Sequence, residues 1–297
     1  MVRYAAIDIG SNAVRLLIAD IIKTDKKYRY NKNMLLRIPL RLGDDAFLDQ
    51  NISEKKQSDL VKTMEAFAKL MEVYQVKKYL ACATSAMREA KNGAVVLRSI
   101  KKASGLDIEI IAGQREADII YANHIEEKLD SGKNYLYIDV GGGSTELSVF
   151  VERKLIASRS FNIGTIRMLD NQDKAETWEE MKVWVKENTR KFKNICGIGT
   201  GGNINKLFKM SGEKDDDPLS FTRLLKMYNE LNSYSLKERM KVFDLKADRA
   251  DVIIPASEIY LTLLKWTGIK QIFVPKVGMA DGIINLLIEE TEEEEEK

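Results

Sequence analysis

Two short segments of the chain share one pattern: an apolar run whose next-to-last residue is Asp and which passes directly into glycine. The first is DIGSN at residues 8–12, where the run 4–9 ends, and the second is DVGGGS at residues 139–144, where the run 135–140 ends. Glycine permits tight turns and a close approach of the backbone to another group. Because each segment leads straight into a further apolar run, the pattern predicts a strand, a tight loop and a second strand in each half of the chain.

The elements predicted around the two loops follow the same order. In the first half, the spacing of apolar residues predicts strands at 4–9, 14–22 and 28–36, a helix from Ser53 to Tyr74, a strand at 79–83, a helix at 94–104, a strand at 108–111 and a helix at 116–128. In the second half it predicts strands at 135–140, 146–151 and 155–161, a helix at 176–191, a strand at 195–198, helical segments at 203–210 and 219–266, a strand at 271–274 and a helix at 281–289. The repeated order indicates an internal duplication.

The duplication predicts the fold class. Strands that alternate with helices are typical of an α/β fold, here with two similar layered domains, and a length of 297 residues suits two domains. We place the first domain at 1–124 and the second at 125–297, with a helical insertion at about 215–266 and a final helix that can pack back on the first domain. Ligands favour clefts between such domains, so we expect a central interdomain cleft.

The composition limits the metals that the chain can bind. It holds two cysteines, Cys82 and Cys196, and one histidine, which is too few for a zinc site built from the usual nitrogen and sulfur ligands. Each cysteine lies in an apolar run at the matching place in its half, and we interpret both as buried free thiols. A metal site must therefore use oxygen ligands, which favours Mg²⁺, Mn²⁺ or Ca²⁺.

The net charge of +2 conceals an uneven distribution. Residues 289–297 hold seven Glu and one Lys, and without them the remaining 46 basic and 38 acidic residues give a net charge of +8. A moderately basic body suits an anionic ligand, and we interpret the Glu run as a solvated, frayed end. The basic stretch 23–41 does not carry the aromatic pattern of a platform for single-stranded nucleic acid, so we expect no nucleic-acid partner.

The sequence carries no recognisable targeting signal. It contains no apolar run of the roughly 18 residues that suggest a membrane span. The N-terminal MVRYAAIDIG becomes acidic at Asp8, before a signal-peptide core is complete. We therefore predict a cytoplasmic protein with no membrane partner.

The two glycine loops have the composition of an anion site. Consecutive backbone N–H groups can form an anion-binding nest, Ser and Asn side chains add donors, and the Asp before each loop can hold a cation or orient a water. Hairpin turns in which Gly and Asp serve only turn geometry are the alternative, but two such loops at equivalent places favour a ligand. The predicted phosphate contacts in the loops are Asp8, Gly10, Ser11, Asn12, Gly141, Gly142, Gly143, Ser144 and Thr145.

Two further carboxylates can take part in the chemistry. Glu146 follows Asp139 by seven residues, so the two can flank one tight hairpin and share a hard cation; a solvated Glu at a strand end is the alternative. Glu116 lies at a predicted helix N-terminus just after a strand. It can act as a general base that activates water, or it can only pair favourably with the helix dipole, and composition does not choose between these roles.

Polar and glycine-rich segments at other strand ends complete the set. Arg88, in ATSAMREAKNG, can bind phosphate through two N–H groups or pair with an acid on a helix surface, and Asn92 of the same segment is a further predicted phosphate contact. Gly201 and Gly202 lie in a turn before a predicted helix, and such turns bind phosphates. The turn does not match a P-loop, and no P-loop occurs in the sequence.

Taken together, these segments resemble the exopolyphosphatase / guanosine pentaphosphate phosphohydrolase (Ppx/GppA) family, within the actin-like ATPase superfamily. They occur in order and cover most of the chain: AAIDIGSNAVRLLI (5–18), RLGDDAFL (41–48), ATSAMREAKNG (83–93), IIAGQREADIIY (110–121), YIDVGGGSTEL (137–147), FNIGTIRM (161–168), GIGTGGNI (197–204), RADVIIPA (249–256) and VGMADGIINLL (277–287). Any one segment alone would say little, but the set is specific.

The resemblance implies two actin-like (ribonuclease H-like) domains and an exopolyphosphatase that removes terminal phosphate from inorganic polyphosphate. It implies that Glu116 is the catalytic base, that Asp139 and Glu146 help to hold Mg²⁺ or Mn²⁺, and that K⁺ is a further candidate cation. The residues that it places in the phosphate cleft are Asp8, Ser11, Asn12, Arg88, Gly142, Gly143 and Ser144. Longer members of the family add C-terminal helical domains, and this chain resembles the short two-domain form.

Other functions share this pattern. A guanosine pentaphosphate (pppGpp) hydrolase would use the same residues, an actin-like sugar or acid kinase would transfer phosphate from ATP, and a non-catalytic nucleotide sensor would bind without turnover. Nothing in the sequence suggests an acceptor pocket for a kinase, and the carboxylates Glu116, Asp139 and Glu146 oppose a sensor. We expect a homodimer, because twofold assemblies are the commonest.

Overall fold

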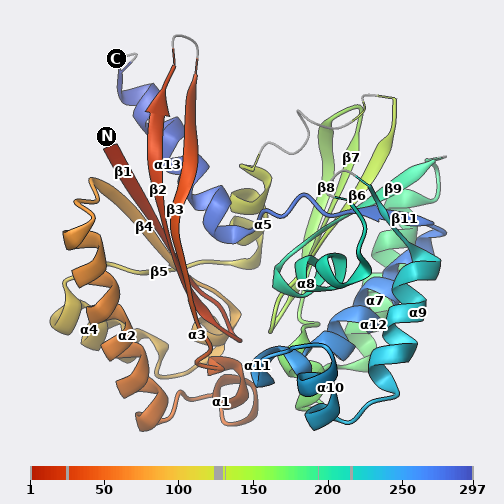
Figure 1. Ribbon diagram of the computed structural model, residues 1–297, viewed down its shortest axis with the longest axis horizontal. Coiled ribbons are helices and arrows are strands. Elements are labelled where there is room, and N and C mark those ends of the chain that lie inside the picture. The colour runs from red at the N-terminus through yellow and green to blue at the C-terminus, as the bar shows by residue number, and fades with distance from the viewer. Residues whose placement is uncertain are drawn as a thin grey trace. The chain divides into compact units, whose positions relative to one another are not determined.

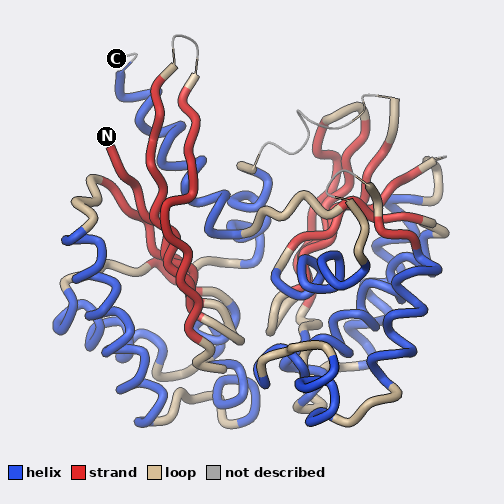
Figure 2. Tube along the Cα trace, viewed as in Figure 1, coloured by secondary structure: helices blue, strands red, loops and turns tan. Residues whose placement is uncertain are grey.

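A computed structural model describes residues 2–24, 27–123, 130, 132–192, 194–214 and 217–295. The chain divides into two units: Met1–Asn123 with Met279–Lys297 make the first, and His124–Gly278 make the second. Each unit consists of one sheet and its helices (Figures 1 and 2). Within the described ranges, no helix is long and apolar enough to cross a membrane.

The first unit is built on a five-stranded sheet with the order β3-β2-β1-β4-β5. Its strands are β1 (Val2–Ile9), β2 (Val14–Lys23), β3 (Tyr28–Ile38), β4 (Lys78–Ala83) and β5 (Glu109–Ile110). The first three form an antiparallel meander, whereas β4 and β5 run parallel to β1. The last six residues of β1 are buried, as expected for a central strand that is covered on both faces.

Helices lie on opposite sides of this sheet (Figure 1). On one side α2 (Glu54–Val73) packs against α4 (Gly93–Ser104), and on the other α5 (Gly113–Tyr121) contacts α13 (Met279–Glu295), which also packs on β1. The predicted N-cap of α2 is confirmed, since the Ser53 side chain accepts a hydrogen bond from the Lys56 amide and so satisfies an N–H group of the first turn. The predicted helical spacing places four side chains in the core: Leu60, Met64, Phe67 and Met71.

The second unit repeats the arrangement of strands. Its sheet has the order β10-β11-β9-β6-β7-β8 and consists of β6 (Asn134–Val140), β7 (Thr145–Val151), β8 (Lys154–Phe161), β9 (Ile195–Thr200), β10 (Leu219–Ser220) and β11 (Gln271–Phe273). β6, β7 and β8 form an antiparallel meander, and β9 and β11 run parallel to β6. With β10 set aside as an added edge strand, the order matches that of the first sheet. The predicted α/β class with two similar domains is thus confirmed.

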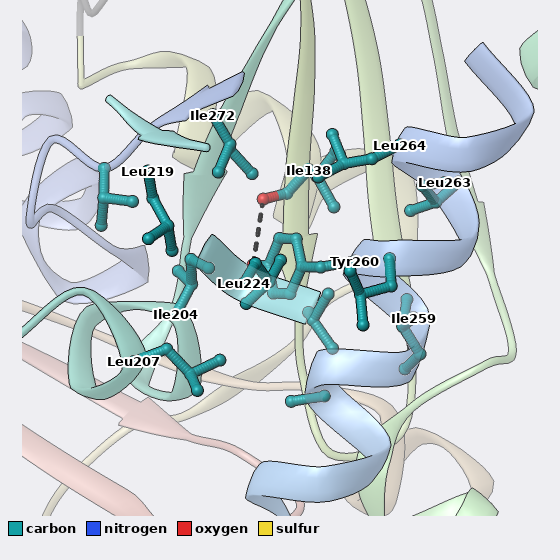
Figure 3. Close-up of a cluster of buried hydrophobic side chains, with 14 of the residues drawn as sticks. Ile138, Ile204, Leu207, Leu219, Leu224, Ile259, Tyr260, Leu263, Leu264 and Ile272 are labelled. Atoms are coloured by element: carbon teal, nitrogen blue, oxygen red, sulfur yellow. Dashed lines mark hydrogen bonds between the residues drawn. The ribbon is translucent and has the colours of Figure 1, made fainter. Parts of the chain in front are cut away.

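The core of the second unit surrounds one tyrosine. The helices α7 (Ala175–Thr189), α8 (Gly202–Ser211), α9 (Phe221–Asn232) and α12 (Ile253–Thr267) bury apolar side chains against β6 and β7. Tyr260 of α12 lies in the middle of this cluster, among Ile204, Leu224 and Leu264 (Figure 3). The predicted helical stretch 219–266, all of it described, is helical only from Phe221: it carries α9, α10 (Leu236–Val242), α11 (Ala247–Ala250) and α12, whereas residues 219–220 form the edge strand β10.

Three short helices are missed by the sequence pattern. α1 (Leu42–Leu48) follows β3, α6 (Thr165–Leu169) follows β8, and α3 (Ser85–Glu89) follows β4. Helices of one or two turns are too short to show a helical spacing of apolar residues. In addition, α1 begins after Arg41, whose φ of 52° is left-handed, and an arginine gives no sign of such a turn.

The predicted helix at 116–128 has the wrong boundaries. α5 begins at Gly113, three residues earlier, and ends at Tyr121; residues 124–128 lie outside the described ranges. The predicted start differs because an acid typical of a helix N-terminus need not be the first helical residue. Glu116 instead lies within the first turn, where an acid also interacts favourably with the helix dipole.

The acidic C-terminal run is not a frayed end over the residues that the structure describes. α13 continues to Glu295 because the strands beside it supply positive charge. Glu295 accepts hydrogen bonds from Lys23 Nζ at 2.5 Å and Tyr28 Oη at 2.6 Å, and Glu294 accepts one from Lys78 Nζ at 2.5 Å. Contacts with another part of the unit thus extend a helix that its own sequence would leave weak.

Candidate functional site

The loop after β1 is held by backbone hydrogen bonds. The carbonyl of Ser11 accepts from the Gly43 amide at 2.8 Å, and that of Asn12 accepts from the Arg41 amide at 3.0 Å, both at the start of α1. In a trans peptide, the N–H group that follows a carbonyl points the opposite way. The N–H groups of Asn12 and Ala13 therefore point away from α1, as an anion-binding loop requires.

The start of α3 is fixed against the same loop. The hydroxyl groups of Ser11 and Ser85 lie 2.9 Å apart, and both residues are buried. The amide of Thr84 donates to the carbonyl of Ile9, the last residue of β1, at 3.1 Å. These contacts hold Ser11 and Asn12, both predicted phosphate contacts, in place. They also involve Ser85, which the sequence did not predict as a site residue.

Asp8 is paired within its own hairpin. Asp8 and Arg15 are opposite each other on β1 and β2, and Arg15 Nη1 lies 2.5 Å from Asp8 Oδ2. The Asp8 side chain is only 5% exposed, whereas that of Arg15 is 28% exposed. A carboxylate removed from water needs such a counter-charge, and Arg15 supplies it from inside the unit.

Glu116 lies near the same end of the first sheet. Asp8, Cys82 and Glu109 are neighbours in register across β1, β4 and β5. Burial is the main reason that the pKa of the Cys82 thiol is raised to about 12; the charges of Glu109, Asp8 and Glu116 act in the same direction, and Arg115 opposes them. Glu116 is half-buried, with its Oε2 atom shielded from solvent. The structure therefore brings Asp8 and Glu116 into one neighbourhood.

Arg88 and Asn92 have different surroundings, although one segment carries both. Arg88 is half-buried, and its Nη1 donates to the carbonyl of Ile111 at 2.7 Å, which ties α3 to the segment that enters α5. The Asn92 side chain accepts from the Ile52 amide at 2.9 Å and donates to the Ile52 carbonyl at 2.8 Å. Both polar groups of Asn92 thus serve the backbone, so we leave it out of the proposed phosphate contacts.

The loop after β6 is held by all three of its glycine carbonyls. They accept hydrogen bonds from the start of α6: Gly141 from the Thr165 amide at 3.0 Å, Gly142 from the Ile166 amide at 2.8 Å and Gly143 from Arg167 Nε at 2.6 Å. By the geometry of trans peptides, the N–H groups of Gly142, Gly143 and Ser144 point away from α6. Three consecutive N–H groups on one side of a loop form the nest that binds an oxyanion.

Close packing of the FNIGTIRM segment makes this support possible. A side-chain carbon on Gly164 would lie 2.5 Å from the carbonyl oxygen of Gly142 and 2.6 Å from the carbonyl carbon of Gly143, so any larger residue would push the loop away. Arg167 is only 6% exposed, and its guanidinium is directed at the backbone of the loop rather than at solvent. The loop is thus fixed by a glycine and a buried arginine.

Asp139 and Glu146 form a pair of like charges. They are directly opposite each other on β6 and β7, so their side chains share one face of the sheet with Cβ atoms about 5 Å apart. Both residues are buried, at 8% and 3% exposure, and Ser160 Oγ donates to Glu146 Oε1 at 2.8 Å. Two buried carboxylates at this spacing repel each other, which favours a cation or a shared proton between them.

This pair fits a hard divalent cation. No group of three or more His, Cys, Asp or Glu residues gathers anywhere in the part of the chain that the structure describes. Mg²⁺ in particular is usually bound by one or two carboxylates and completes its shell with water and phosphate oxygens. Two carboxylates beside an anion-binding loop are therefore a sufficient protein contribution.

The other predicted contacts of the second unit lie around Asp139 and its loop. A side-chain carbon on Gly201, whose φ is +96°, would lie 2.7 Å from Asp139 Oδ1, so this glycine packs directly on the carboxylate. Gly202 packs in the same way against the guanidinium of Arg249. Thr145 is buried, and its hydroxyl donates to a backbone carbonyl just before α6 at 2.7 Å. Its side chain therefore supports the loop.

Several residues of these sites escape the sequence analysis: Arg15, Ser85, Ser160, Gly164 and Arg167. Arg15 follows Asp8 by seven residues, the spacing by which Glu146 follows Asp139, so a comparison of the two halves could have found it. Gly164 and Arg167 act through α6, which is too short to predict. In the sequence, both residues lie in the segment FNIGTIRM, to which no role is assigned.

The sequence matches a known family and several relatives. A family model described as the Ppx/GppA phosphatase family matches residues 36–290. The bifunctional 3-dehydroquinate synthase/phosphatase of Fusobacterium nucleatum is 26% identical over 97% of this chain and 46% of its own length. Exopolyphosphatase 2 of Mycobacterium tuberculosis is 25% identical over 95% of this chain and 98% of its own length. The guanosine-5'-triphosphate,3'-diphosphate pyrophosphatase of Aliivibrio fischeri is 22% identical over 98% of this chain and 60% of its own length. The chain thus spans part of the first and third proteins and nearly all of the second.

Solved structures share the fold. An exopolyphosphatase from Cytophaga hutchinsonii superposes with a TM-score of 0.83 at 22% identity, covering 97% of this chain and 98% of that one. The Aquifex aeolicus member of the Ppx/GppA family superposes with a TM-score of 0.73 at 25% identity, covering 99% of this chain and 98% of that one. These likenesses confirm the predicted fold of two actin-like domains.

Proposed function

Because the chain belongs to the Ppx/GppA phosphatase family, we propose that it is a metal-dependent exopolyphosphatase that releases terminal phosphate from inorganic polyphosphate. The observation that carries this proposal is the loop after β6, where a nest of N–H groups adjoins a pair of buried carboxylates. Such a nest binds phosphate oxygens, and a cation held by the carboxylates balances their charge. The relative that this chain matches over 98% of its length is an exopolyphosphatase.

In the second unit, Asp139 and Glu146 would hold the divalent metal that the family implies. Oxygen ligands favour Mg²⁺ or Mn²⁺, and K⁺ is a further candidate cation. When bound, the metal neutralises phosphate charge and orients the phosphate group. The N–H groups of Gly142, Gly143 and Ser144 bind the non-bridging oxygens and stabilise the charge that develops on them during the reaction.

In the first unit, Glu116 is the general base. It takes a proton from a water whose oxygen forms a bond to the terminal phosphorus, while the bond from that phosphorus to the bridging oxygen breaks. The products are inorganic phosphate and a polyphosphate shorter by one residue. The N–H groups of the first loop, the Ser11 hydroxyl and the Arg88 guanidinium bind phosphate oxygens. Catalysis then depends mainly on positioning and electrostatic stabilisation.

Hydrolysis of pppGpp is the second candidate. It is favoured by the relative from Aliivibrio fischeri, a guanosine-5'-triphosphate,3'-diphosphate pyrophosphatase that aligns with 98% of this chain. The terminal phosphate of pppGpp is also joined by a phosphoanhydride bond, so the same loops and the same base would act on it. The two candidates differ in what lies beyond the terminal phosphates, not in the chemistry.

A phosphate-release panel tests both candidates. Purified protein is supplied with polyphosphates of several lengths, pppGpp or ATP, with Mg²⁺ or Mn²⁺, and inorganic phosphate is measured over time. We expect release from polyphosphate, and loss of release in E116Q and D139N variants that keep the wild-type melting curve. Faster release from pppGpp would favour the second candidate. Transfer of phosphate from ATP to a small acceptor, or tight binding without turnover, would contradict both.

Several features of the protein stay predictions. They are the cytoplasmic location, the homodimer, the lack of nucleic-acid and membrane partners, the domain limits 1–124 and 125–297, and the cleft between the domains. Light scattering on the purified protein tests the homodimer, with a mass of twice 33.8 kDa expected.

A further inference from the structure

The hydroxyl of Tyr260 is a polar group in an otherwise aliphatic part of the second core. The tyrosine is completely buried, and Figure 3 shows its ring among Ile, Leu and other apolar side chains. Its hydroxyl donates to the carbonyl of Thr200 at 2.6 Å and lies 3.4 Å from the carbonyl of Ile138. A buried tyrosine hydroxyl needs a partner, and here it uses the ends of two strands.

One carbonyl lies directly before a proposed metal ligand, and the other lies directly before the glycine that packs on this ligand. Ile138 precedes Asp139 on β6 and Thr200 precedes Gly201 after β9, and Asp139 and Thr200 are partners in register. Gly201 in turn packs on the Asp139 carboxylate. One hydroxyl thus joins the two peptide units that lead into Asp139 and into the glycine turn against it.

We infer that Tyr260 is a positioning residue for Asp139, because its hydroxyl fixes the ends of β6 and β9 and so the direction in which the carboxylate meets a divalent metal. This inference rests on the proposed function. Tyr260 does not touch the metal or the substrate; it acts through the backbone. Groups that hydrogen-bond a metal ligand typically change metal affinity by about 10–100-fold when they are removed, and we expect Tyr260 to act in the same range through the backbone.

The hydroxyl stays a donor under ordinary conditions. Burial raises the pKa of Tyr260 well above its usual value, and the nearby charge of Asp139 adds to this effect. The proton therefore remains on the tyrosine oxygen, which donates it chiefly to the Thr200 carbonyl at 2.6 Å and more weakly to the Ile138 carbonyl at 3.4 Å.

A purely structural role is the alternative, and one substitution separates the two. Y260F keeps the ring and its packing and removes only the oxygen. A control is Y135F. Tyr135 lies on β6, at the end of the strand away from Asp139; it is also a buried residue, and its hydroxyl accepts a hydrogen bond from the Asp130 amide at 3.1 Å. Both variants lose one tyrosine hydroxyl that hydrogen-bonds to the backbone, but only Y260F loses the link beside Asp139.

The test is a calorimetric titration of Mn²⁺ into wild-type protein, Y260F, Y135F and D139N, together with melting curves without metal. We expect Y260F to weaken Mn²⁺ binding by about 10–100-fold, Y135F to bind like wild type, and both to melt a few degrees lower. If Y260F binds Mn²⁺ like wild type while its melting temperature falls as in Y135F, the role is structural and the inference is wrong. If D139N binds like wild type, the proposed metal site fails first and the inference fails with it.

Discussion

The two hairpins of this protein share a backbone and differ in charge. At the strand ends, the row of register partners across the first meander is Asp8, Arg15 and Arg37, and the row across the second is Asp139, Glu146 and Ser160. The first row carries one negative and two positive side chains. The second carries two negative side chains and a hydroxyl. Equivalent positions in a duplicated fold thus have opposite electrostatic character.

The difference assigns different ligands to the two loops. In the first, Arg15 neutralises Asp8, so the carboxylate of this hairpin needs no added cation, and the loop N–H groups suit a phosphate. In the second, two buried carboxylates favour a bound cation, and the nest beside them favours a phosphate as well. We therefore propose that the duplicated loop is a phosphate cradle in one half and a cradle with a metal site in the other.

The loops also differ in how they are supported. α1 holds the first loop through two backbone amides, whereas α6 adds the buried Arg167 and the close approach of Gly164. The second loop thus has the larger number of fixed carbonyls. Greater rigidity is expected where a metal site demands a defined geometry.

The largest effect should come from Glu116, which belongs to neither hairpin. If both loops only bind phosphate and metal, the proton of the attacking water must go to a group outside them. E116Q should therefore lower the rate of phosphate release by about 10²–10⁴-fold. Substrate affinity should change little. Single-turnover measurements separate the two quantities, and an E116Q variant that is folded and fully active would exclude Glu116 as the base.

The next largest effect should follow from giving the second hairpin the charges of the first. E146R would pair Asp139 with a guanidinium, as Arg15 pairs Asp8, and would remove the cation site. We expect a loss of activity of at least about 10–100-fold, with a metal-free melting temperature no lower than that of wild type. E146Q is the control, because it removes the same carboxylate without supplying a positive charge. Retained activation of E146R by Mg²⁺ would contradict the assignment.

Removing the counter-charge of the first hairpin should mainly affect stability. R15L leaves the buried Asp8 carboxylate without its guanidinium. Breaking a buried pair costs about 3–5 kcal/mol; because Arg15 is 28% exposed, we expect a smaller loss, about 2 kcal/mol in the free energy of unfolding. Denaturant titration measures this loss. A simultaneous loss of Mn²⁺ binding would show that the two hairpins do not divide their roles as proposed.

The smallest effect is expected at the acidic end of α13. K23A removes the ion pair with Glu295, in which the two side chains are 62% and 46% exposed. Exposed pairs contribute little because water and salt screen them. We expect no measurable change in the denaturation midpoint or in phosphate release. A clear destabilisation would mean that the end of α13 supports the first sheet more strongly than its exposure suggests.

Much of the fold follows from the sequence, and the parts that do not follow have a physical reason. The order of strands and helices along the chain, the N-cap at Ser53 and the duplication are predictable because alternation, capping and glycine turns are local signals. The short helices α1, α3 and α6 are not, because helices of one or two turns have no periodicity and depend on tertiary hydrogen bonds to the loops. The extension of α13 to Glu295 likewise depends on lysines from other strands.

The candidate site is predictable in its glycines and acids but not in their support. Asp139 and Glu146 can be paired from their spacing alone, whereas the difference between Arg15 and Glu146 appears only when the two hairpins are aligned in register. Arg167 and Tyr260 bind backbone atoms that are distant in sequence, and no local pattern reports such contacts. Asn92 shows the reverse case, a polar residue in a family motif whose side chain bonds to Ile52.

The division of roles between the hairpins is tested most directly by the Mg²⁺ dependence of phosphate release from polyphosphate in wild-type protein, R15L and E146Q. We predict that wild type and R15L reach half-maximal rate at the same Mg²⁺ concentration, and that E146Q needs a much higher concentration or shows no activation. An unchanged Mg²⁺ dependence in E146Q, together with a shifted one in R15L, would place the metal in the first hairpin and contradict the assignment.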